Sequence, residues 1–396
     1  MARILVCIPS GQAIPNLVSI IHYKPEKIIF LKTTMAEKFG FDDKILDSLV
    51  DRGLTFPKES IFKVYVANEN SILELQNALA STLSFFSTSD ELIVNITGGT
   101  KPMSIATYNY FSTRVANIVY ILNNDKTLNC KNDQEENIKL DPPLTCKQFL
   151  LAHGFDLTIK KQNAHASNSI IMNVIRWIAA NFGNKDLINF KDDKEKSIFR
   201  DRGGDLDKIS WNSEVSKEII SRISDIQKQC PETKKLWGRV LTGEWLEIFI
   251  WDILLRNKDY LKIHDIQLGP VARQIGAKND KKINQVVQNE LDIAFMKGTK
   301  LNFIECKSGA QNHSSNSKQD VFYKIESIKN QFGALQVYSH LASSSSNILD
   351  ENHNILESVQ IRADLYNCKI ISSEIIIELA KASSVEDECK ILAPFI

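Results

Sequence analysis

Residues 91–111 read ELIVNITGGTKPMSIATYNYF, in which an apolar run of strand length passes through a glycine turn into a stretch of helical character. Gly98 and Gly99 can adopt a positive φ and let a ligand approach the backbone. Thr100 is a favoured helix N-cap residue. The free N–H groups of the first helical turn, the helix dipole and Lys101 would then converge on one point. This stretch therefore predicts a strand, a tight turn and a helix, with an anion site between them.

The rest of the N-terminal part alternates apolar runs of strand length with amphipathic stretches of helix length. That alternation is typical of a parallel sheet with crossover helices, and it predicts a Rossmann-like layer. The predicted strands are residues 2–9, 27–33, 60–67, 91–97 and 117–124. The predicted helices are residues 14–23, 35–51, 71–84 and 102–113. A less regular tail, residues 127–140, is expected to add an antiparallel pair at the sheet edge.

A second polar turn, Ser10-Gly11-Gln12, ends the first predicted strand. Ligands bind at the carboxyl edge of such sheets, where we expect both turns to lie. The spacings GxxxxGK[ST] and GxGxxG are absent, which excludes a mononucleotide P-loop and the dinucleotide fingerprint. The alternative is that GGTKP only connects a strand to a helix. The candidate ligand-binding residues are Ser10, Gly11, Gln12, Thr97, Gly98, Gly99, Thr100 and Lys101.

The C-terminal part has strands and helices of its own. A strong helix is predicted over residues 239–257, strands over 264–270, 289–296 and 301–307, and a further helix near 321–335. The region between the two α/β parts reads as a helical connector with an exposed charged loop at 191–208. We therefore expect an α/β chain in three parts, with boundaries at residues 1–152, 153–236 and 237–396.

The predicted strands 289–296 and 301–307 are joined by a four-residue loop whose length and composition suit a β-hairpin. If Met296 faces Leu301, then Asp292 lies opposite Glu305 and Lys307 points to the same face. Opposed carboxylates need compensation, and a hard divalent cation such as Mg²⁺ or Mn²⁺ would supply it. A lysine beside such an ion can hold a water or offset charge on a phosphate, which predicts phosphodiester hydrolysis. The alternative is a surface hairpin in which Lys307 bridges the two acids.

This hairpin resembles the motif of the restriction-endonuclease-like PD-(D/E)xK nucleases, with D-x12-E-x-K at Asp292, Glu305 and Lys307. The proline of the motif name is missing here, as it is in many members. The predicted helix that contains Lys324 and Gln331 resembles one that often contributes a further polar residue in these nucleases. The resemblance implies a restriction-endonuclease-like α/β domain with metal-dependent nuclease activity.

A third metal-binding carboxylate is expected on the helix that opens this domain. Glu244 and Glu247 lie one turn apart there and hence near one face. Either could instead be a solvated helix carboxylate. The segment GEWLE resembles the helix glutamate motif of the same nucleases, which implies Glu247 as the third acid and metal ligand, with Glu244 in reserve.

The N-terminal segment NITGGTKPM resembles the phosphate-binding motif of CARF domains, the CRISPR-associated Rossmann-fold sensors of cyclic oligoadenylates. Ser10 and Gln12 fall where the first-strand loop of that family touches its ligand. The order of sensor, connector and nuclease covers nearly the whole chain and resembles the ancillary nucleases of type III CRISPR systems.

The resemblance implies a homodimer whose paired sensor domains bind one cyclic tetra-adenylate as an allosteric activator. It also implies a metal-dependent endonuclease, using Mn²⁺ or Mg²⁺, that cuts single-stranded DNA and RNA and nicks supercoiled DNA in antiviral defence. A cyclic ligand with four phosphates has near two-fold symmetry, which suits a dimer offering two copies of each loop. Activation then requires that the ligand binds the closed state better than the open one.

Composition limits the remaining classes of protein. Lysine plus arginine (48) equals aspartate plus glutamate (48), so nucleic-acid binding must come from a local site. The mean hydropathy of −0.18 argues against a membrane bundle. The N-terminal apolar run is too short for a signal peptide, and the seven cysteines are scattered without a CxxC motif, so we expect a cytoplasmic protein.

Three other functions remain open. A CARF-containing transcription regulator would use the middle region as a winged helix beside an inactive nuclease-like domain, which the intact Asp292, Glu305 and Lys307 disfavour. A ring nuclease would degrade its own activator, but no histidine or carboxylate stands close to the N-terminal loops. A DNA-repair enzyme or a modification-dependent restriction enzyme would be activated by a different effector.

Overall fold

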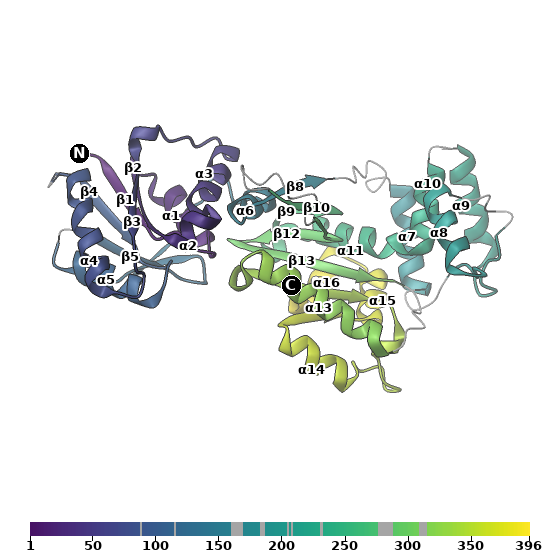
Figure 1. Cartoon of the computed structure of the whole chain (residues 1–396). Coiled ribbons are helices and arrows are strands. Elements are labelled where there is room, and N and C mark those ends of the chain that lie inside the picture. The colour runs from purple at the N-terminus through teal and green to yellow at the C-terminus, as the bar shows by residue number, and fades with distance from the viewer. Residues whose placement is uncertain are drawn as a thin grey trace.

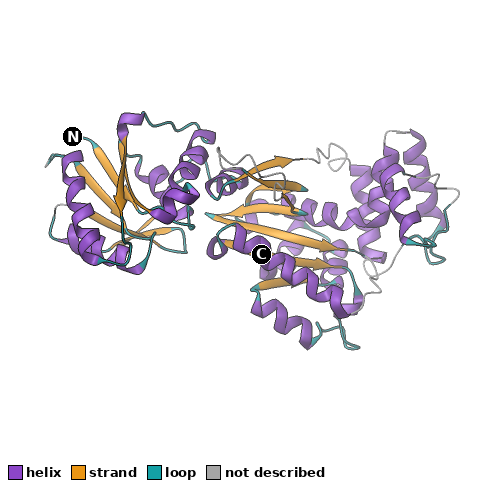
Figure 2. Ribbon diagram, in the orientation of Figure 1, coloured by secondary structure: helices purple, strands orange, loops and turns teal. Residues whose placement is uncertain are grey.

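The computed structural model describes the chain except for residues 88, 115, 160–168, 183–186, 204–205, 207–208, 230–232, 276–287 and 309–314. The ribbon shows an N-terminal α/β domain, a central α/β domain and a group of helices on the side of the central domain away from the N-terminus (Figure 1). Strands lie inside both α/β domains, with helices packed outside them (Figure 2). The α/β fold class expected from the sequence is confirmed.

The N-terminal sheet has the strand order β3-β2-β1-β4-β5-β6-β7. The pairs among β1 to β5 are parallel, whereas β5 with β6 and β6 with β7 are antiparallel. The predicted parallel layer and its antiparallel edge are therefore confirmed. The strands are β1 Arg3–Cys7, β2 Lys27–Thr33, β3 Ile61–Val66, β4 Glu91–Asn95, β5 Asn117–Ile121, β6 Lys126–Asn129 and β7 Gln134–Asn137.

Both faces of this sheet are covered, because successive strand side chains point to opposite sides. In β1, Leu5 packs in one apolar layer and Ile4 in the other. The first layer is filled by α1 (Ile14–Tyr23) and α3 (Phe41–Asp51), and the second by α4 (Ile72–Ser81) and α5 (Lys101–Ser112).

The helix predicted over residues 35–51 is interrupted. Gly40 has a φ of 59°, a left-handed conformation that ends α2 (Thr34–Phe39) and lets α3 start in a new direction. The position of a glycine within an amphipathic stretch was the available signal for this break.

The segment that follows the N-terminal sheet contributes a strand to a second, three-stranded sheet. After α6 (Cys146–Ala152), β8 (Phe155–Ile159) pairs antiparallel with β10 (Pro270–Gln274), which pairs with β11 (Gln288–Glu290). The helical connector predicted from residue 153 onward is wrong at residues 155–159, which form a strand. Their partner strand lies more than a hundred residues further on, so local sequence pattern could not reveal this pairing.

The middle region is a helical group that packs on the central domain. It comprises α7 (Ser169–Phe182), α8 (Asp193–Arg202), α9 (Lys217–Gln229) and α10 (Lys234–Arg239). The exposed loop predicted at residues 191–208 contains α8 instead. Phe199 is buried in the core of the group, and a side chain at Gly238 would lie 2.5 Å from the Phe199 carbonyl oxygen. The close approach of α8 to α10 thus depends on this glycine.

The central sheet has the order β15-β14-β13-β12-β9, with β13, β14 and β15 parallel and the other neighbours antiparallel. Apolar layers cover both faces, one of them containing α11 and the other α13. The strands are β9 His264–Leu268, β12 Ile293–Lys297, β13 Lys300–Lys307, β14 Val337–Ser343 and β15 Cys368–Ile371. The helices are α11 Trp245–Arg256, α12 Lys258–Leu261, α13 Ser315–Gln331, α14 Glu357–Leu365, α15 Ser373–Lys381 and α16 Val385–Leu392.

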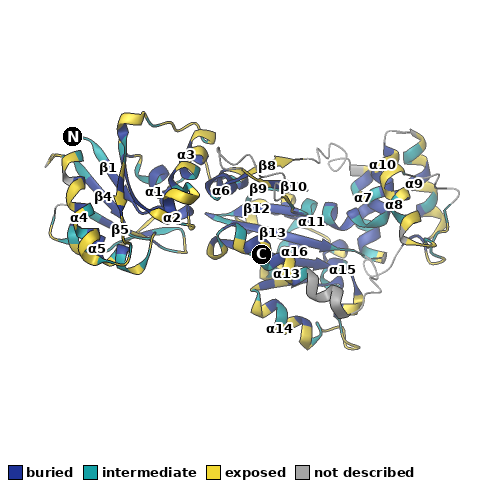
Figure 3. Cartoon of the chain, viewed as in Figure 1, coloured by how far each residue is buried: buried dark blue, intermediate teal, exposed yellow. Residues whose placement is uncertain are grey.

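One apolar core joins the two α/β domains. Phe149 of α6 and Phe155 of β8 belong to the same buried cluster as Leu291, Met296 and Phe332 of the central domain. Buried residues run along the sheets of both domains (Figure 3). A continuous apolar interface of this kind restricts relative motion of the two domains within one chain.

No helix among the described residues is both long and apolar enough to cross a bilayer. The six cysteines that the structure describes are free thiols, as expected from their scattered positions, and Cys230 lies outside the described residues.

The shared core yields a stability prediction. The rings of Phe155 and Phe332 meet edge to face with centroids 4.8 Å apart, and Phe332 is fully buried. Phe332→Ala should lower the free energy of unfolding by about 3–5 kcal/mol through lost burial and the cavity left behind. Urea unfolding measures the change. The exposed Leu365→Ala is the control and should shift it by less than about 0.5 kcal/mol; equal effects would contradict the shared core.

Candidate active site and ligand-binding edge

The β12–β13 hairpin has the predicted register. Met296 pairs with Leu301, and the pairing continues without a shift to Ile293 opposite Ile304. One residue further along this register, Asp292 and Glu305 stand opposite each other. The turn is tighter than the expected four-residue loop, because Lys297 and Lys300 pair and leave only two residues between them.

Glu305 is a buried carboxylate held by two lysines. Its side chain is 1% exposed, and its Oε1 accepts a hydrogen bond from Lys307 Nζ at 2.6 Å. Lys324 Nζ, from α13, lies 2.7 Å from Oε1 and 2.8 Å from Oε2. The sequence indicated Lys324 only through the resemblance of its helix; its direct pairing with Glu305 follows from how α13 packs on the sheet.

Asp292 is held across the hairpin, where its Oδ2 accepts a hydrogen bond from the Cys306 N–H at 2.7 Å. Burial and the neighbouring Glu305 charge raise the pKa of Asp292 to about 6. Burial lowers the pKa of Lys307, but the attraction of Glu305 outweighs it, so the pKa of Lys307 is raised and the side chain stays an ammonium. Two acids and a cation therefore share this end of the hairpin.

Glu247, in the first turn of α11, lies close to the same place. Burial raises the pKa of the Cys306 thiol, and the charges of Asp292, Glu247 and Glu305 raise it further. The charges of all three carboxylates thus act on one residue of β13. The carboxylate of Glu244, the reserve candidate, forms an ion pair with Arg239 at 2.8 Å.

The donor set suits a divalent cation. Carboxylate oxygens are the ligands that Mg²⁺ and Mn²⁺ prefer. Burial, and then the Glu305 charge, raise the pKa of Asp292, and a cation beside its carboxylate would favour the ionised form. In the described part of the chain, no three or more His, Cys, Asp or Glu side chains are already arranged as a metal site. Glu305 is instead neutralised by Lys307 and Lys324.

The two polar turns follow the adjacent parallel strands β1 and β4, so both lie at the carboxyl edge of the N-terminal sheet, where the glycine turn packs against the end of β1. A side chain at Gly98 would lie 2.1 Å from the Ile8 carbonyl oxygen, and one at Gly99, where φ is 77°, would lie 2.4 Å from Ile8 Cγ2. Only glycine permits this approach of the turn to Ile8. Thr100 is the N-cap of α5, its hydroxyl accepting from Met103 N–H at 3.4 Å.

The candidate ligand residues divide into two groups. Gly11, Gln12, Gly99 and Lys101 are exposed at the edge, where they can meet a ligand; Ser10 and Thr100 are half-buried there, and Gly98 is buried. Thr97 instead faces inward: its hydroxyl donates to Asn95 Oδ1 at 2.6 Å and accepts from the Ile121 N–H at 2.7 Å. It therefore connects the end of β4 to the end of β5.

Sequence reasoning missed the buried amides beneath these loops. Asn95 donates to the Pro15 carbonyl at 3.0 Å and to Ser19 Oγ at 2.9 Å, and Asn16 donates to the Ile8 carbonyl at 2.8 Å. An asparagine at the end of an apolar strand was the signal available. These bonds fix the loops on α1 and prepare their backbone groups for a ligand.

Two family models match the two α/β domains. Residues 4–149 match the Card1 CARF domain, and residues 234–378 match the Card1-like endonuclease domain. A search of curated proteins found no match. The fold and site thus define a protein in which a CARF domain is joined to an endonuclease domain. Since the two models together match well over half of the chain, it belongs to the Card1-like family.

Solved structures show the same fold over the whole length. Can2 from Sulfobacillus thermosulfidooxidans, in complex with cyclic tetra-adenylate, is 18% identical with a TM-score of 0.64, and the match covers 99% of each chain. Protein VC1899 from Vibrio cholerae is 17% identical with a TM-score of 0.70, covering 99% of this chain and 98% of that one. A type III CRISPR defence DNA nuclease activated by cyclic oligoadenylate is 14% identical with a TM-score of 0.54, covering 87% of this chain and 45% of that one.

The contact between the glycine turn and Ile8, at the end of β1, can be tested. Gly98→Ala should cost about 1–3 kcal/mol of stability, because the added methyl group meets a backbone carbonyl oxygen that cannot move freely. Gly11→Ala is the matched control, since its nearest neighbour, Phe41 Cζ, is 3.8 Å from the added carbon. Thermal unfolding followed by circular dichroism compares the two. A smaller loss in Gly98→Ala than in Gly11→Ala would contradict the described loop packing.

Proposed function

We propose that this chain is an endonuclease, activated by cyclic tetra-adenylate, that hydrolyses phosphodiester bonds in single-stranded DNA and RNA and nicks supercoiled DNA in type III CRISPR defence. The observation that carries the proposal is the facing of Asp292 and Glu305 across one hairpin with Lys307 beside them. The family match and the fold shared with cyclic-oligoadenylate-linked nucleases support it. The proposed parts are a sensor over residues 1–152, a connector over 153–236 and a nuclease over 237–396.

The roles of the site residues follow from their charges. Asp292 and Glu305 would hold Mn²⁺ or Mg²⁺, with Glu247 as the third acid. When bound, the metal would polarise the scissile phosphate and lower the pKa of a water molecule. Lys307 remains an ammonium because its pKa is raised, so it offsets the charge that builds on the phosphate rather than accepting a proton.

The ligand would bind at the carboxyl edge of the sensor sheet. The backbone N–H groups at the start of α5 and the exposed Lys101 offer an anion site, and the loop at Ser10, Gly11 and Gln12 lies beside it. Two copies of this edge in a homodimer would surround a cyclic ligand that carries four phosphates. Occupation of the edge would favour the active state of the nuclease domain.

A cleavage assay tests both halves of the proposal. The purified protein is incubated with Mn²⁺ and labelled single-stranded DNA or RNA, with and without cyclic tetra-adenylate. Cleavage should require the ligand and fall by at least about a hundredfold in a Glu305→Gln, Lys307→Ala double variant, because the metal site and the cation are both lost. Glu326→Gln is the matched control and should cut like the wild type, because this half-buried carboxylate accepts from Asn330 of its own helix, α13.

Two results would change the proposal. Tight ligand binding without cleavage under any condition would favour the alternative, a CARF-containing transcription regulator with an inactive nuclease-like domain. Absence of ligand binding as well would contradict the proposed activator, and cyclic tri- and hexa-adenylate would then be compared in the same assay.

A further inference from the structure

The N-terminal domain touches the turn of the candidate catalytic hairpin through one side chain. Asp125 lies in the turn between β5 and β6, and its Oδ1 accepts hydrogen bonds from Thr299 N–H at 3.2 Å and from Thr299 Oγ1 at 2.5 Å. Thr299 is 7% exposed and Asp125 is half-buried, so these bonds lie in a partly buried contact. Asn123, from the same turn, accepts a weaker bond from Gln336 Nε2 at 3.4 Å.

The two turns are shaped for each other. Gly298, beside Thr299, has a φ of 61°, and a side chain there would lie 1.9 Å from Asp125 Oδ2. Asp125 itself has a left-handed φ of 60°, and its carbonyl accepts from the Ile138 N–H at 2.9 Å, which fixes the turn on its own sheet. Backbone conformation on both sides therefore presents the carboxylate to the hairpin.

On the sensor side, this contact leads back to the ligand-binding edge. Thr97, in the glycine loop, accepts a hydrogen bond from Ile121, the last residue of β5. Four residues later the chain reaches Asp125. A movement of the glycine loop would thus act on the turn through one hydrogen bond and one short segment.

On the nuclease side, the contact leads to the two acids. Thr299 is at the tip of the hairpin, and unbroken antiparallel pairing runs from Lys297 opposite Lys300 to Ile293 opposite Ile304. Asp292 and Glu305 follow at its far end. Since paired strands move together, a displacement of the tip changes the position of both carboxylates.

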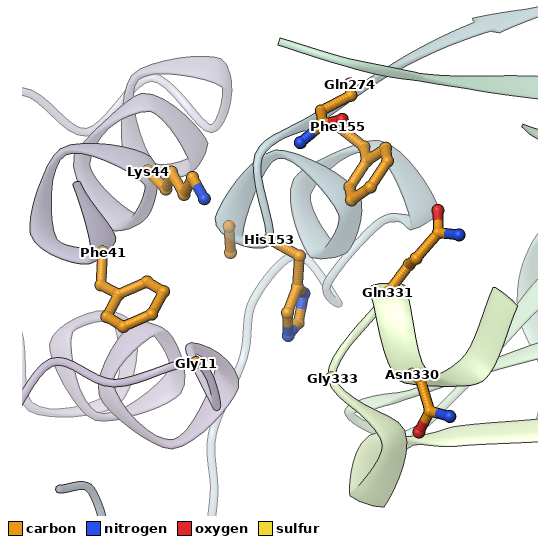
Figure 4. A pocket seen from close by; sticks show the side chains of 10 residues that line it. Gly11, Phe41, Lys44, His153, Phe155, Gln274, Asn330, Gln331 and Gly333 are labelled. Atoms are coloured by element: carbon orange, nitrogen blue, oxygen red, sulfur yellow. The ribbon is translucent and has the colours of Figure 1, made fainter. Parts of the chain in front are cut away.

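A cavity also lies between the two domains, beside their shared apolar core. A cavity of about 410 Å³ separates Gly11 of the sensor loop from Gln331 and Gly333 at the end of α13, with His153 between them (Figure 4). The same helix carries Lys324, the partner of Glu305. This cavity adjoins the apolar contact of Phe155 with Phe332, whereas at Asp125 the domains are joined by hydrogen bonds.

We propose that Asp125 is a positioning residue that couples occupation of the sensor edge to the placement of Asp292 and Glu305 through its bonds to Thr299. The inference rests on the proposed function and adds the path of its regulation. Allosteric coupling between two sites amounts to a factor of about 5 to 150 in typical proteins. Loss of the contact should therefore reduce activation strongly without weakening ligand binding.

The test compares variants of the full-length protein with Mn²⁺ and labelled single-stranded DNA. In Asp125→Ala, the ratio of cleavage with cyclic tetra-adenylate to cleavage without it should fall by at least about fivefold, while the ligand affinity measured by calorimetry stays the same or rises. Asp125→Asn keeps an oxygen acceptor and should restore most of the ratio. Gly298→Ala should reproduce the loss from the nuclease side, where the added carbon would displace the carboxylate.

The control is Asp133→Ala, in the neighbouring β6–β7 turn, where the aspartate is exposed and has the same left-handed backbone, with a φ of 57°. Unchanged activation in Asp125→Ala, or an equal loss in Asp133→Ala, would overturn the coupling. If the wild type shows no activation, the proposed function fails, and hydrogen exchange at residues 297–300 decides the coupling separately. Ligand-dependent protection there that Asp125→Ala removes would support it, and unchanged exchange in the wild type would overturn it.

Discussion

Two carboxylates opposed across one antiparallel pair dominate the chemistry of this molecule. Asp292 and Glu305 stand at the same end of the β12–β13 hairpin, and burial, with the Glu305 charge added to it, raises the pKa of Asp292 to about 6. Such a pair persists only where cations offset it. Here Lys307 and Lys324 neutralise Glu305, from β13 and α13 respectively.

The surrounding structure keeps that hairpin in place and connects it to the sensor. The strands of the hairpin have apolar layers on both faces, and one of those layers continues into the N-terminal domain through α6 and β8. A single apolar core therefore joins the domain that carries the ligand-binding edge to the domain that carries the hairpin. The hydrogen bonds of Asp125 add a specific polar contact to this interface, because they join the β5–β6 turn of the N-terminal domain to the tip of the hairpin.

Local pattern predicted the parts of the molecule that depend on local rules. The parallel strands, the glycine turn at Gly98 and the register of Met296 with Leu301 all follow from alternation, turn chemistry and strand pairing. What the sequence could not reveal depends on distant partners. β8 has its partner strand in the C-terminal half, Lys324 reaches Glu305 only through helix packing, and Asp125 meets Thr299 across 174 positions.

The most direct test of the proposed metal centre uses electron paramagnetic resonance to measure Mn²⁺ binding to the protein without nucleic acid. We predict that the wild type binds Mn²⁺ at this site and that the Mn²⁺ affinity falls by at least about tenfold in Asp292→Asn, because a carboxylate ligand is lost. Glu290→Gln, on the exposed strand β11, should bind like the wild type. Equal Mn²⁺ affinity in Asp292→Asn and the wild type would contradict the assignment of this hairpin as the metal centre.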